Sequence, residues 1–453
     1  MMPSKPANQS HQAAAGLEDH FDLVCVGFGP ASLAIAVALH DRGVKTRVLF
    51  TERQRSFKWH AGMLLPNARM QISFMKDLAT LRDPRSKFTF VNYLKSKNRL
   101  VAFTNLSTFL PLREEYNDYL AWCASHFEQH VRYGQETISV SPMKNRQGPI
   151  RSWRVVSQDV DTNDRSFITA RHVVLAVGGK PKIPRGLTDD GLDSRVVHSS
   201  AYSTVVPTIL ADTDKVYDLA VVGGGQSSAE IFNDLQNRFP NARITLYTGA
   251  SALKPSDDSP FVNEIFDPER VNTFYNLSHE SQQKTILSDK STNYGVVRPE
   301  LLDHMYESMY HQRFREPHQS KWRCKIEAWR EVVGYNKLLD GRLQLRLKNT
   351  SSGEVSMSES SFDLAIVGTG YERNFHETLL APTRDLLPSD RFVVGRDYRL
   401  QFREDAVAGD SGIWLQGCCE DSHGLSDTLL SILAVRGGEM VDSIFPSPTQ
   451  AKL

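Results

Sequence analysis

The hydrophobic pattern near the N-terminus predicts a strand, a turn and a helix. An apolar run at 21–26 reads as a buried strand and leads into the glycine-rich stretch Gly27-Phe28-Gly29. A small, apolar helix is expected from about Pro30 to Leu39, and "KTRVLF" at 45–50 reads as the next parallel strand. Together they make a β-α-β unit of about 30 residues, the usual length of this motif.

The same pattern occurs a second time, far along the chain. "DLAVVGGGQSSAEIFNDLQ" starts at Asp218 as a strand, a glycine turn and a helix, and a further strand follows at 243–248. Two more apolar strands, within 171–179 and 362–371, also end in glycines. Strands that alternate with helices and end in glycine turns predict an α/β protein with doubly wound parallel sheets.

Three other regions have a different pattern. Residues 57–112 are rich in aromatic and basic side chains with weak periodicity, so we expect a long functional connection there. Residues 255–325 are polar with several helical stretches, and 424–445 reads as one capped amphipathic helix. The sequence has no repeat of solenoid length. Its only internal similarity is between the two β-α-β units.

Composition narrows the class of protein. The chain has 453 residues, with 40% hydrophobic and 23% charged residues, as in ordinary globular proteins. Its 53 basic residues balance 53 acidic ones, so nothing calls for nucleic acid or an acidic membrane as a partner. The cysteines form no CxxC pair, which favours a reducing compartment over secretion; they are Cys25, Cys123, Cys324, Cys418 and Cys419.

The chain ends carry few targeting signals. The longest clean apolar run, 31–39, is too short to span a bilayer. Residues 1–20 lack the apolar core of a signal peptide, and we expect a disordered tail. The final Ala-Lys-Leu at 451–453 differs from the peroxisomal address Ser-Lys-Leu by one residue, so the cytoplasm is expected and the peroxisome is the alternative.

The first glycine turn has the features of a dinucleotide site. Gly27 permits a tight turn, Gly29 lets the backbone approach a pyrophosphate, and Pro30 begins the helix. Ser32 takes the place of the usual third glycine and is small enough for helix–strand packing. Glu52, just past the second strand, is the acid that binds ribose hydroxyls in such sites.

The second glycine turn predicts another dinucleotide site, formed by Gly223, Gly224, Gly225, Gln226 and Ser227. No carboxylate follows its second strand, which ends in "LYTGAS", and this absence favours NADPH over NADH. No arginine follows at once either, and Lys254 is the nearest cation.

Two dinucleotide sites in one chain are typical of a flavoprotein that takes hydride from a nicotinamide. We expect FAD in the first site and NADPH in the second. Reduced flavin can pass electrons to a disulfide, a carrier or oxygen. Cys418 and Cys419 are vicinal and lack the spacing of a redox pair, so oxygen is the favoured acceptor.

Long sequence strings resemble one family over about residues 21–445. The strings are "FKWHAGMLLPNARMQISFMKDLATLRDPRSKFTFVNYL" (57–94), "KPSDDSPFVNEIF" (254–266), "NYGVVRPE" (293–300), "VGTGY" (367–371) and "HGLSDTLLSILAVRGGE" (423–439). They resemble the flavin-dependent N-hydroxylating monooxygenases, above all the fungal L-ornithine N(5)-hydroxylating members that serve hydroxamate siderophore synthesis. The resemblance implies two Rossmann-like domains, for FAD and NADPH, and a small, mainly helical substrate-binding insertion.

The resemblance also implies a reaction. NADPH reduces FAD, O2 adds to give a flavin C(4a)-hydroperoxide, and the ornithine side-chain amine attacks its distal oxygen. N(5)-hydroxy-L-ornithine and water are the products. The L-lysine N(6)-hydroxylating relatives share this mechanism, and a pocket one methylene longer separates them by only about 1–3 kcal/mol.

The family's site residues map onto this chain by motif. The implied substrate-binding residues are Lys76, Asn263, Asn293 and Ser431. The implied flavin contacts are Trp59, His60, Gln71, Thr428, Leu429 and Leu430, the last three at the start of the final helix, whose positive end would face the flavin. Arg113, Asn263 and Asn293 would contact the nicotinamide nucleotide. No residue is assigned as certainly catalytic, because the flavin carries the chemistry, and no metal is expected.

One position departs from the family pattern. In the fungal ornithine enzymes an arginine after the second strand of the second unit binds the 2′-phosphate of NADPH, and here that position is Gly249. A catalytically idle FAD- and NADP-binding regulator is a further alternative, although Lys76, Asn263 and Asn293 are all present. A pyridine nucleotide–disulfide reductase fails for lack of a redox cysteine pair.

The expected organisation follows from these assignments. The family often forms homotetramers, which we expect here also. The expected parts are a tail at 1–20, an FAD-binding domain at 21–210 and 395–446, an NADPH-binding domain at 211–256 and 325–394, a substrate-binding insertion at 257–324, and a C-terminal tail at 447–453.

Overall fold

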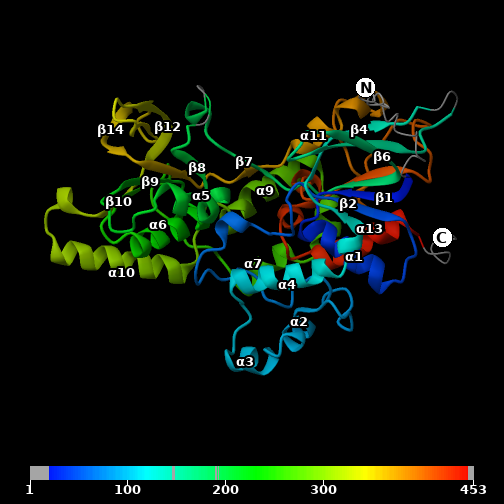
Figure 1. Cartoon of the computed structure of the whole chain (residues 1–453), viewed down its shortest axis with the longest axis horizontal. Coiled ribbons are helices and arrows are strands. Elements are labelled where there is room, and N and C mark those ends of the chain that lie inside the picture. The colour runs from blue at the N-terminus through cyan, green and yellow to red at the C-terminus, as the bar shows by residue number, and fades with distance from the viewer. Residues whose placement is uncertain (1–19, 145–147, 189–190, 192, 447–453) are drawn as a thin grey trace, which may run out of the picture.

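The computed structural model describes residues 20–144, 148–188, 191 and 193–446. Two sheets lie toward opposite ends of an elongated molecule (Figure 1); the first is mixed, because its β4-β5-β6 edge is antiparallel, and the second is parallel. The tail expected at 1–20 lies outside the described residues except for His20, and so does the C-terminal 447–453 with its Ala-Lys-Leu. In the described part, no helix combines the length and the apolar character needed to cross a membrane.

The first sheet has seven strands in the order β3-β2-β1-β6-β5-β4, with β17 paired to β6. Its strands are β1 (His20–Val26), β2 (Val48–Thr51), β3 (Val131–Arg132), β4 (Gln135–Pro142), β5 (Trp153–Asp159), β6 (Arg165–Leu175) and β17 (Gly412–Leu415). The predicted β-α-β unit is confirmed: β1 pairs in parallel with β2, and α1 (Pro30–Asp41) connects them. The second strand is shorter than expected, because residues 45–47 precede β2.

The second sheet has five strands in the order β11-β10-β9-β15-β8, all parallel. They are β8 (Val196–His198), β9 (Asp218–Val222), β10 (Arg243–Tyr247), β11 (Cys324–Glu327) and β15 (Leu364–Val367). The second β-α-β unit is confirmed, with α6 (Gln226–Arg238) between β9 and β10. β8 comes from the segment that we assigned to the first domain, since the expected boundary at 210 follows it.

A three-stranded antiparallel sheet was not predicted. It consists of β12 (Arg330–Lys337), β13 (Leu343–Asn349) and β14 (Val355–Phe362). Buried residues of these strands pack in one apolar cluster with residues of β9, β10 and β15, so this sheet covers one face of the second parallel sheet. β7 (Lys180–Pro181) and β16 (Tyr371–Glu372) form a small pair of their own.

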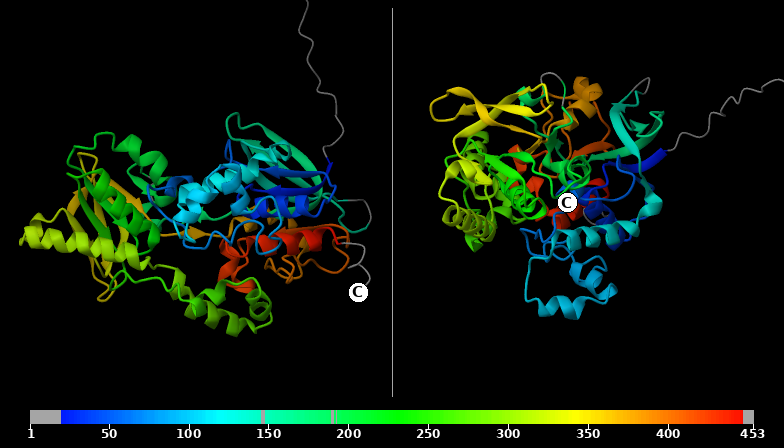
Figure 2. Two further views of the ribbon diagram at one scale, coloured as in Figure 1. Left: turned by 90° about the horizontal axis from the view of Figure 1, so that it is seen from below. Right: turned by 60° about the vertical axis from the view of Figure 1, so that its left-hand side comes forward.

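Helices and connections surround the two sheets. The remaining helices are α2 (Phe90–Ser96), α3 (Leu100–Asn105), α4 (Arg113–Ser125), α5 (Tyr202–Ile209), α7 (Pro260–Asn263), α8 (Arg270–Tyr275), α9 (His279–Asn293), α10 (Pro299–Arg315), α11 (Phe375–Leu379), α12 (Glu420–His423) and α13 (Leu433–Ile444). Within the connection 57–112, α2 and α3 form a knob at the bottom of Figure 1. The helices of 257–324 include α7 to α10, and Figure 2 shows part of this segment projecting below the body of the molecule.

The prediction of one helix at 424–445 is wrong. The chain forms a short 3-10 helix at Leu425–Thr428, passes through an extended Leu429, and begins α13 only at Leu433. The Arg436 guanidinium donates to the Asp427 carbonyl oxygen at 2.5 Å and to its carboxylate at 2.8 Å. The buried Asp427–Arg436 pair thus ties the 3-10 helix to the first turn of α13 across the interruption.

Candidate functional site

The first glycine turn is shaped for a phosphate group. Gly27 has a φ of 90°, and a Cβ atom on it would lie 2.5 Å from the Ala176 carbonyl oxygen. Gly29 precedes α1 with open space where a side chain would be. No side chain caps α1 and its first turn carries no acid, so its N–H groups and positive dipole end are available to an anion. These residues fit the pyrophosphate of FAD.

Two alanine variants test stability and FAD binding separately, Gly27→Ala for stability and Gly29→Ala for binding. We expect Gly27→Ala to cost about 1–2 kcal/mol from the left-handed backbone alone, with added strain against Ala176. Gly29→Ala has ordinary backbone angles and open space, so we expect a folded protein with weakened FAD binding. Thermal unfolding and flavin content after purification measure the two effects. Equal stability of both variants would contradict this account of Gly27.

Glu52 lies beside this turn, as expected, but already holds the backbone. It is buried, and its carboxylate accepts from the N–H of Phe28 and from the N–H of Gln54, both at 2.8 Å. Each carboxylate oxygen keeps a further lone pair for a ribose hydroxyl. The Ser32 hydroxyl, fully buried in the first turn of α1, has no partner among the described residues.

The second glycine turn repeats the arrangement. Gly223 has a φ of 131°, and a Cβ there would lie 2.5 Å from the Gly368 carbonyl oxygen. Gly225 precedes α6, which again has no side-chain cap and no acid in its first turn. Ser227 is in that first turn, and Gly224 packs so closely on Thr248 that a Cβ would lie 2.5 Å from its hydroxyl. A second dinucleotide phosphate therefore fits here.

Gln226 and Arg113 are engaged in protein contacts. Gln226 donates to Glu230 and accepts from the N–H of Arg298, both at 2.9 Å. Arg113 binds the Glu230 carboxylate through two hydrogen bonds of 2.9 Å and donates to the Met63 carbonyl. This ion pair, with side chains 13% and 9% exposed, joins α4 to the glycine-turn helix α6. A nucleotide contact of Arg113 stays a prediction.

The residues expected at the flavin come from distant segments. Trp59 lies in edge contact with His60 and with Tyr116, and the ring of His60 is 6.0 Å from that of Tyr371. Gln71 is exposed and has no hydrogen bond among the described residues.

The expected helix end at Thr428, Leu429 and Leu430 requires a correction. Because α13 begins at Leu433, these residues do not offer the positive end of that helix to a flavin. Thr428 ends the 3-10 helix, and Leu429 and Leu430 lie between that helix and α13, beside the Asp427–Arg436 pair.

Lys76, expected at the substrate carboxylate, lies beside the 257–324 segment. Its side chain is 21% exposed, and its ammonium is 3.9 Å from the Asp267 carboxylate of the 257–324 segment. The next residue, Asp77, accepts four hydrogen bonds, from the N–H groups of Ala79, Thr80 and Phe90 and from the Thr80 hydroxyl. Burial nevertheless raises the pKa of Asp77. This buried carboxyl fixes the loop that carries Lys76.

The other expected substrate residues differ in their partners. Asn263, at the end of α7, donates to the carbonyls of Asp258 and Ser259, as a turn residue does. Asn293 ends α9 and has no side-chain hydrogen bond among the described residues. Ser431 is 2% exposed, and its hydroxyl likewise has no partner in that part of the chain.

Sequence analysis missed a network that connects the 257–324 segment to the C-terminal loop. The Tyr294 hydroxyl lies 2.7 Å from the Thr428 hydroxyl and 3.2 Å from the Glu420 carboxylate, which also pairs with Lys290 at 2.8 Å. Burial, with the charge of Glu420, raises the pKa of Tyr294 to about 12, so this phenol is a hydrogen-bond donor at neutral pH. These residues are too far apart in sequence for any local pattern to reveal the contact.

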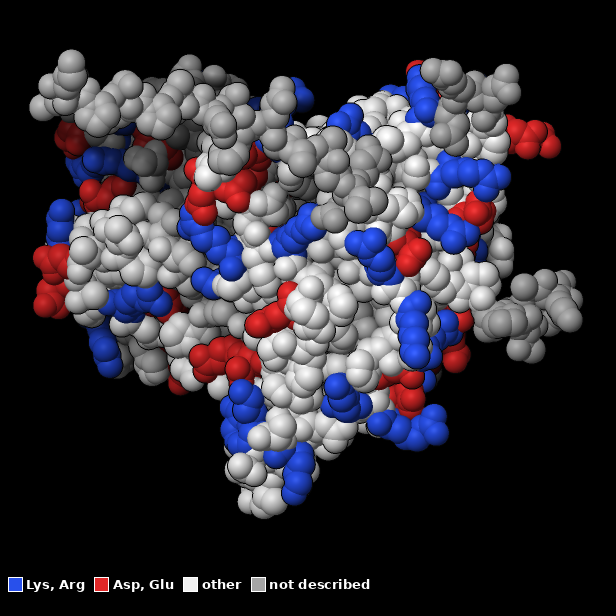
Figure 3. Space-filling model, turned by 45° about the vertical axis from the view of Figure 1, so that its right-hand side comes forward, with Lys and Arg blue, Asp and Glu red and all other residues white. Residues whose placement is uncertain are grey.

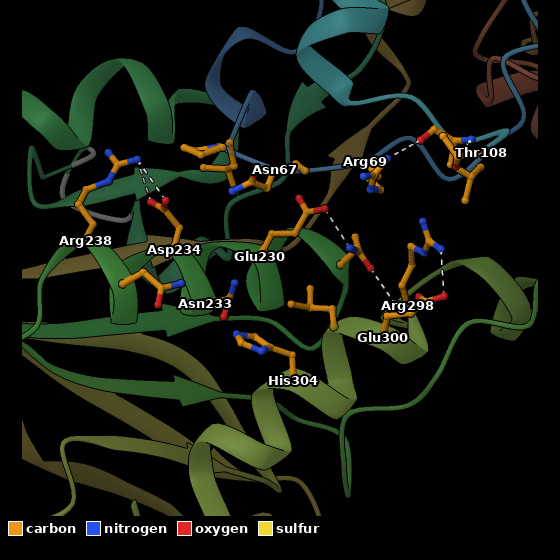
Figure 4. Close-up of a pocket in the computed structure, with 17 residues that line it drawn as sticks. Asn67, Arg69, Thr108, Glu230, Asn233, Asp234, Arg238, Arg298, Glu300 and His304 are labelled. Atoms are coloured by element: carbon orange, nitrogen blue, oxygen red, sulfur yellow. Dashed lines mark hydrogen bonds and ion pairs between the residues drawn. The ribbon is translucent and has the colours of Figure 1, made fainter. Parts of the chain in front are cut away.

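A cavity of about 790 Å³ lies beside α6 (Figure 4). Its walls come from residues 65–69, from 108 and 110, from α6, and from the start of α10 with Arg298. Of the expected site residues only Gln226 lines it, so this cavity is not the site that the two glycine turns define.

The charged surface and the cysteines bear on the sequence-based expectations. Basic and acidic side chains are interspersed on the face shown in Figure 3. All five cysteines are free thiols, and the described residues include no group of three or more His, Cys, Asp or Glu side chains arranged for a metal ion.

Two sheets whose parallel strands each lead into a glycine turn and an uncapped helix define a dinucleotide-binding α/β protein with two nucleotide sites. Comparison with known proteins makes the class specific. The model of the L-lysine 6-monooxygenase/L-ornithine 5-monooxygenase family matches residues 19–373, and the chain belongs to this family.

Individual relatives cover nearly the whole chain. An L-ornithine N(5)-monooxygenase of Ajellomyces capsulatus is 53% identical over 436 residues, which are 95% of this chain and 92% of that protein. The ornithine hydroxylase of Pseudomonas aeruginosa superposes with a TM-score of 0.86 at 39% identity, covering 94% of this chain and 98% of its own. The ornithine N-hydroxylase of Kutzneria sp. 744, solved with reduced FAD, NADP+ and L-ornithine, also has a TM-score of 0.86, at 34% identity over 94% of this chain and 99% of its own.

Proposed function

We propose that this chain is an FAD- and NADPH-dependent monooxygenase that hydroxylates L-ornithine at N(5), for hydroxamate siderophore biosynthesis. O2, NADPH and a proton are consumed, and water and NADP+ are released with N(5)-hydroxy-L-ornithine. The observation that carries the proposal is that the 257–324 segment contacts both the 57–112 connection and the C-terminal loop. Lys76 lies 3.9 Å from Asp267, and Tyr294, next to Asn293, bonds Thr428, which supports a substrate site formed by these three segments.

The protein's own part is to bind and orient the amino acid. Bound flavin, reduced by the nicotinamide, supplies the activated oxygen. Lys76 binds the substrate carboxylate, while Asn263 and Asn293 hold the amino-acid end and the nucleotide. The free ornithine side-chain amine has a pKa of about 10.4, so it must lose a proton before it attacks oxygen. A nearby cation such as Lys76 favours that loss, because it repels the ammonium form.

Ornithine is favoured over lysine by the names of the relatives. The Ajellomyces capsulatus protein at 53% identity and both solved structures compared above are named as ornithine enzymes. Lysine N(6)-hydroxylation by the same mechanism is the alternative, since one methylene is worth only about 1–3 kcal/mol.

The test uses purified protein supplemented with FAD. NADPH and NADH oxidation and hydroxylamine product are measured with L-ornithine and L-lysine side by side. Hydroxylated ornithine without hydroxylated lysine is the expected result. Product only with lysine would move the protein to the sister activity, and hydrogen peroxide alone with both amino acids would contradict the assignment.

Ser431→Ala is expected to have a small, specific effect. The buried hydroxyl has no protein partner in the described part of the chain, so its loss leaves no orphaned group and stability stays within about 0.5 kcal/mol. If this hydroxyl contacts ornithine, KM rises about 2- to 10-fold, the value of one neutral hydrogen bond. Steady-state kinetics and thermal unfolding measure both, and an unchanged KM would remove Ser431 from the substrate pocket.

The finer organisation belongs to the same proposal. The first sheet with residues 395–446 would hold FAD, the second sheet NADPH, and the 257–324 segment the amino acid. A homotetramer is expected from the family resemblance. The cytoplasm is the proposed compartment, and the peroxisome is the alternative that the final Ala-Lys-Leu raises.

A further inference from the structure

The turn between β11 and β12 lies against the end of β10. The N–H of Arg330 donates to the Thr248 carbonyl at 2.9 Å, and the N–H of Trp329 donates to the Ala250 carbonyl at 3.0 Å. In a dinucleotide-binding sheet the adenosine ribose lies at the carboxyl end of the strand after the glycine-turn helix, which here is β10. The Trp329–Arg330 turn is therefore a wall of the expected ribose site.

The residues directly after β10 supply no cation of their own. Gly249 has no side chain, and a Cβ on it would lie 3.3 Å from a Thr350 methyl carbon and 3.8 Å from the Glu331 Cβ. Lys254 is exposed, and its backbone is tied to the 257–324 side by a bond from the N–H of Val297. A charge for the 2′ position has to come from a neighbouring strand.

Arg330 is a cation on the turn that is bonded to the end of β10. It begins β12, two residues before Val332, whose side chain is buried in the same cluster as Tyr247 at the end of β10. Alternate residues of a strand share a face, so Arg330 lies on the Tyr247 side. Its positive charge acts to lower the pKa of the Tyr247 phenol, although burial raises that pKa overall. Among the described residues Arg330 forms no ion pair, even with the adjacent Glu331.

We propose that Arg330 binds the 2′-phosphate of NADPH, in place of the arginine that Gly249 lacks. This inference rests on the proposed function, because it assumes a nicotinamide nucleotide in the second site. A guanidinium suits the task, since its planar fork donates two bonds to a phosphate. Trp329, 46% exposed with a φ of 59°, presents its indole beside the same turn and offers an apolar face to the adenine. Glu331 acts against binding of the 2′-phosphate, because its carboxylate repels the phosphate and would instead accept from the 2′-hydroxyl of NADH.

The test measures binding directly, on the FAD-loaded full chain. Isothermal titration with adenosine 2′,5′-bisphosphate is compared with titration of 5′-AMP, which lacks the 2′-phosphate. The variants are Arg330→Ala, Lys254→Ala, Glu331→Gln, and Lys348→Ala as the matched control, because Lys348 lies opposite Glu331 in the β12–β13 pair. Flavin absorbance before each titration confirms that every variant is folded.

The expected result is a loss specific to Arg330. Arg330→Ala should weaken the bisphosphate about 10- to 100-fold, the value of a charged hydrogen bond, and leave 5′-AMP unchanged. Glu331→Gln should strengthen the bisphosphate, and Lys348→Ala should change neither ligand. The same order should appear in the KM for NADPH but not for NADH.

Other outcomes overturn the inference in distinguishable ways. A loss with Lys254→Ala and none with Arg330→Ala would make Lys254 the phosphate ligand. Equal affinity of the wild-type chain for both ligands would mean that the site ignores the 2′-phosphate, while the nucleotide site itself stands. If the wild-type chain bound neither ligand, the proposed nucleotide site would fail together with Arg330.

Discussion

Lys76→Ala is expected to raise the KM for ornithine about 100-fold, because it removes a partly buried cation from the substrate carboxylate. The flavin and nucleotide turns are untouched, so NADPH oxidation should continue and release hydrogen peroxide in place of hydroxylated product. Steady-state kinetics with separate assays for NADPH, peroxide and hydroxylamine measure this split. The split distinguishes a substrate-binding role from general damage, which would lower nucleotide oxidation as well.

A matched control is available on the same connection. Lys87→Ala removes an exposed lysine that only lies over the ring of Phe88. It should leave the KM for ornithine and the coupling unchanged. Lys76→Arg keeps the charge and should retain part of the ornithine binding. If Lys76→Ala and Lys87→Ala behaved alike, Lys76 would be a surface lysine and the proposed pocket would lose its anchor.

The second large effect is expected at the buried ion pair that interrupts the C-terminal helix. Asp427 and Arg436 are 0% and 2% exposed, and Asp427 also accepts from the N–H of Cys419 at 2.7 Å. Arg436→Met leaves the carboxylate buried without its counter-ion, which costs about 3–5 kcal/mol. We expect a lower unfolding temperature and release of FAD at a lower temperature, because this pair holds the segment that carries Thr428. Thermal unfolding followed by circular dichroism and by flavin fluorescence measures both.

Two further variants make this prediction specific. Arg384→Met breaks the exposed pair with Glu377, whose side chains are 44% and 52% exposed, and should cost less than about 1 kcal/mol. The double variant Asp427→Asn/Arg436→Met removes both charges and should regain part of the lost stability. A double variant no more stable than Arg436→Met would show that the loss comes from packing and not from the unpaired charge.

The hydrophobic pattern and the glycine motifs predicted the two β-α-β units, because each unit is encoded within a short stretch of sequence. The two glycine turns follow from strand, turn and helix signals within about 30 residues, and the structure has both. The interruption before Leu433 was not predicted, because the apolar spacing of 424–445 fits a continuous helix and gives no sign of the buried Asp427–Arg436 pair. The β12–β14 sheet was missed for a related reason, since only its packing on the second parallel sheet shows which face is apolar.

Some residues of the candidate site could likewise be found from a local motif, and others depend on contacts between distant parts of the chain. Gly27 and Gly223 form tight turns because they adopt a positive φ, and the sequence motif is enough to find them. Arg113 was expected at the nucleotide, and two of its three hydrogen bonds go to Glu230, which is 117 positions away in the chain. No sequence pattern announces such a pairing. Arg330 was not found from the sequence either, because its closeness to Thr248 exists only after β10 and β12 come together.

The Arg113–Glu230 pair has a mechanical consequence. It joins α4, which packs with the first sheet, to α6 of the second sheet through two hydrogen bonds between side chains that are mostly shielded from water. Separating the two helices would break both bonds at once, so the pair opposes rotation of one half of the molecule against the other. The two helices would therefore keep a fixed spacing when nucleotides bind, and the chain's own contribution to bringing them together would be a rigid frame.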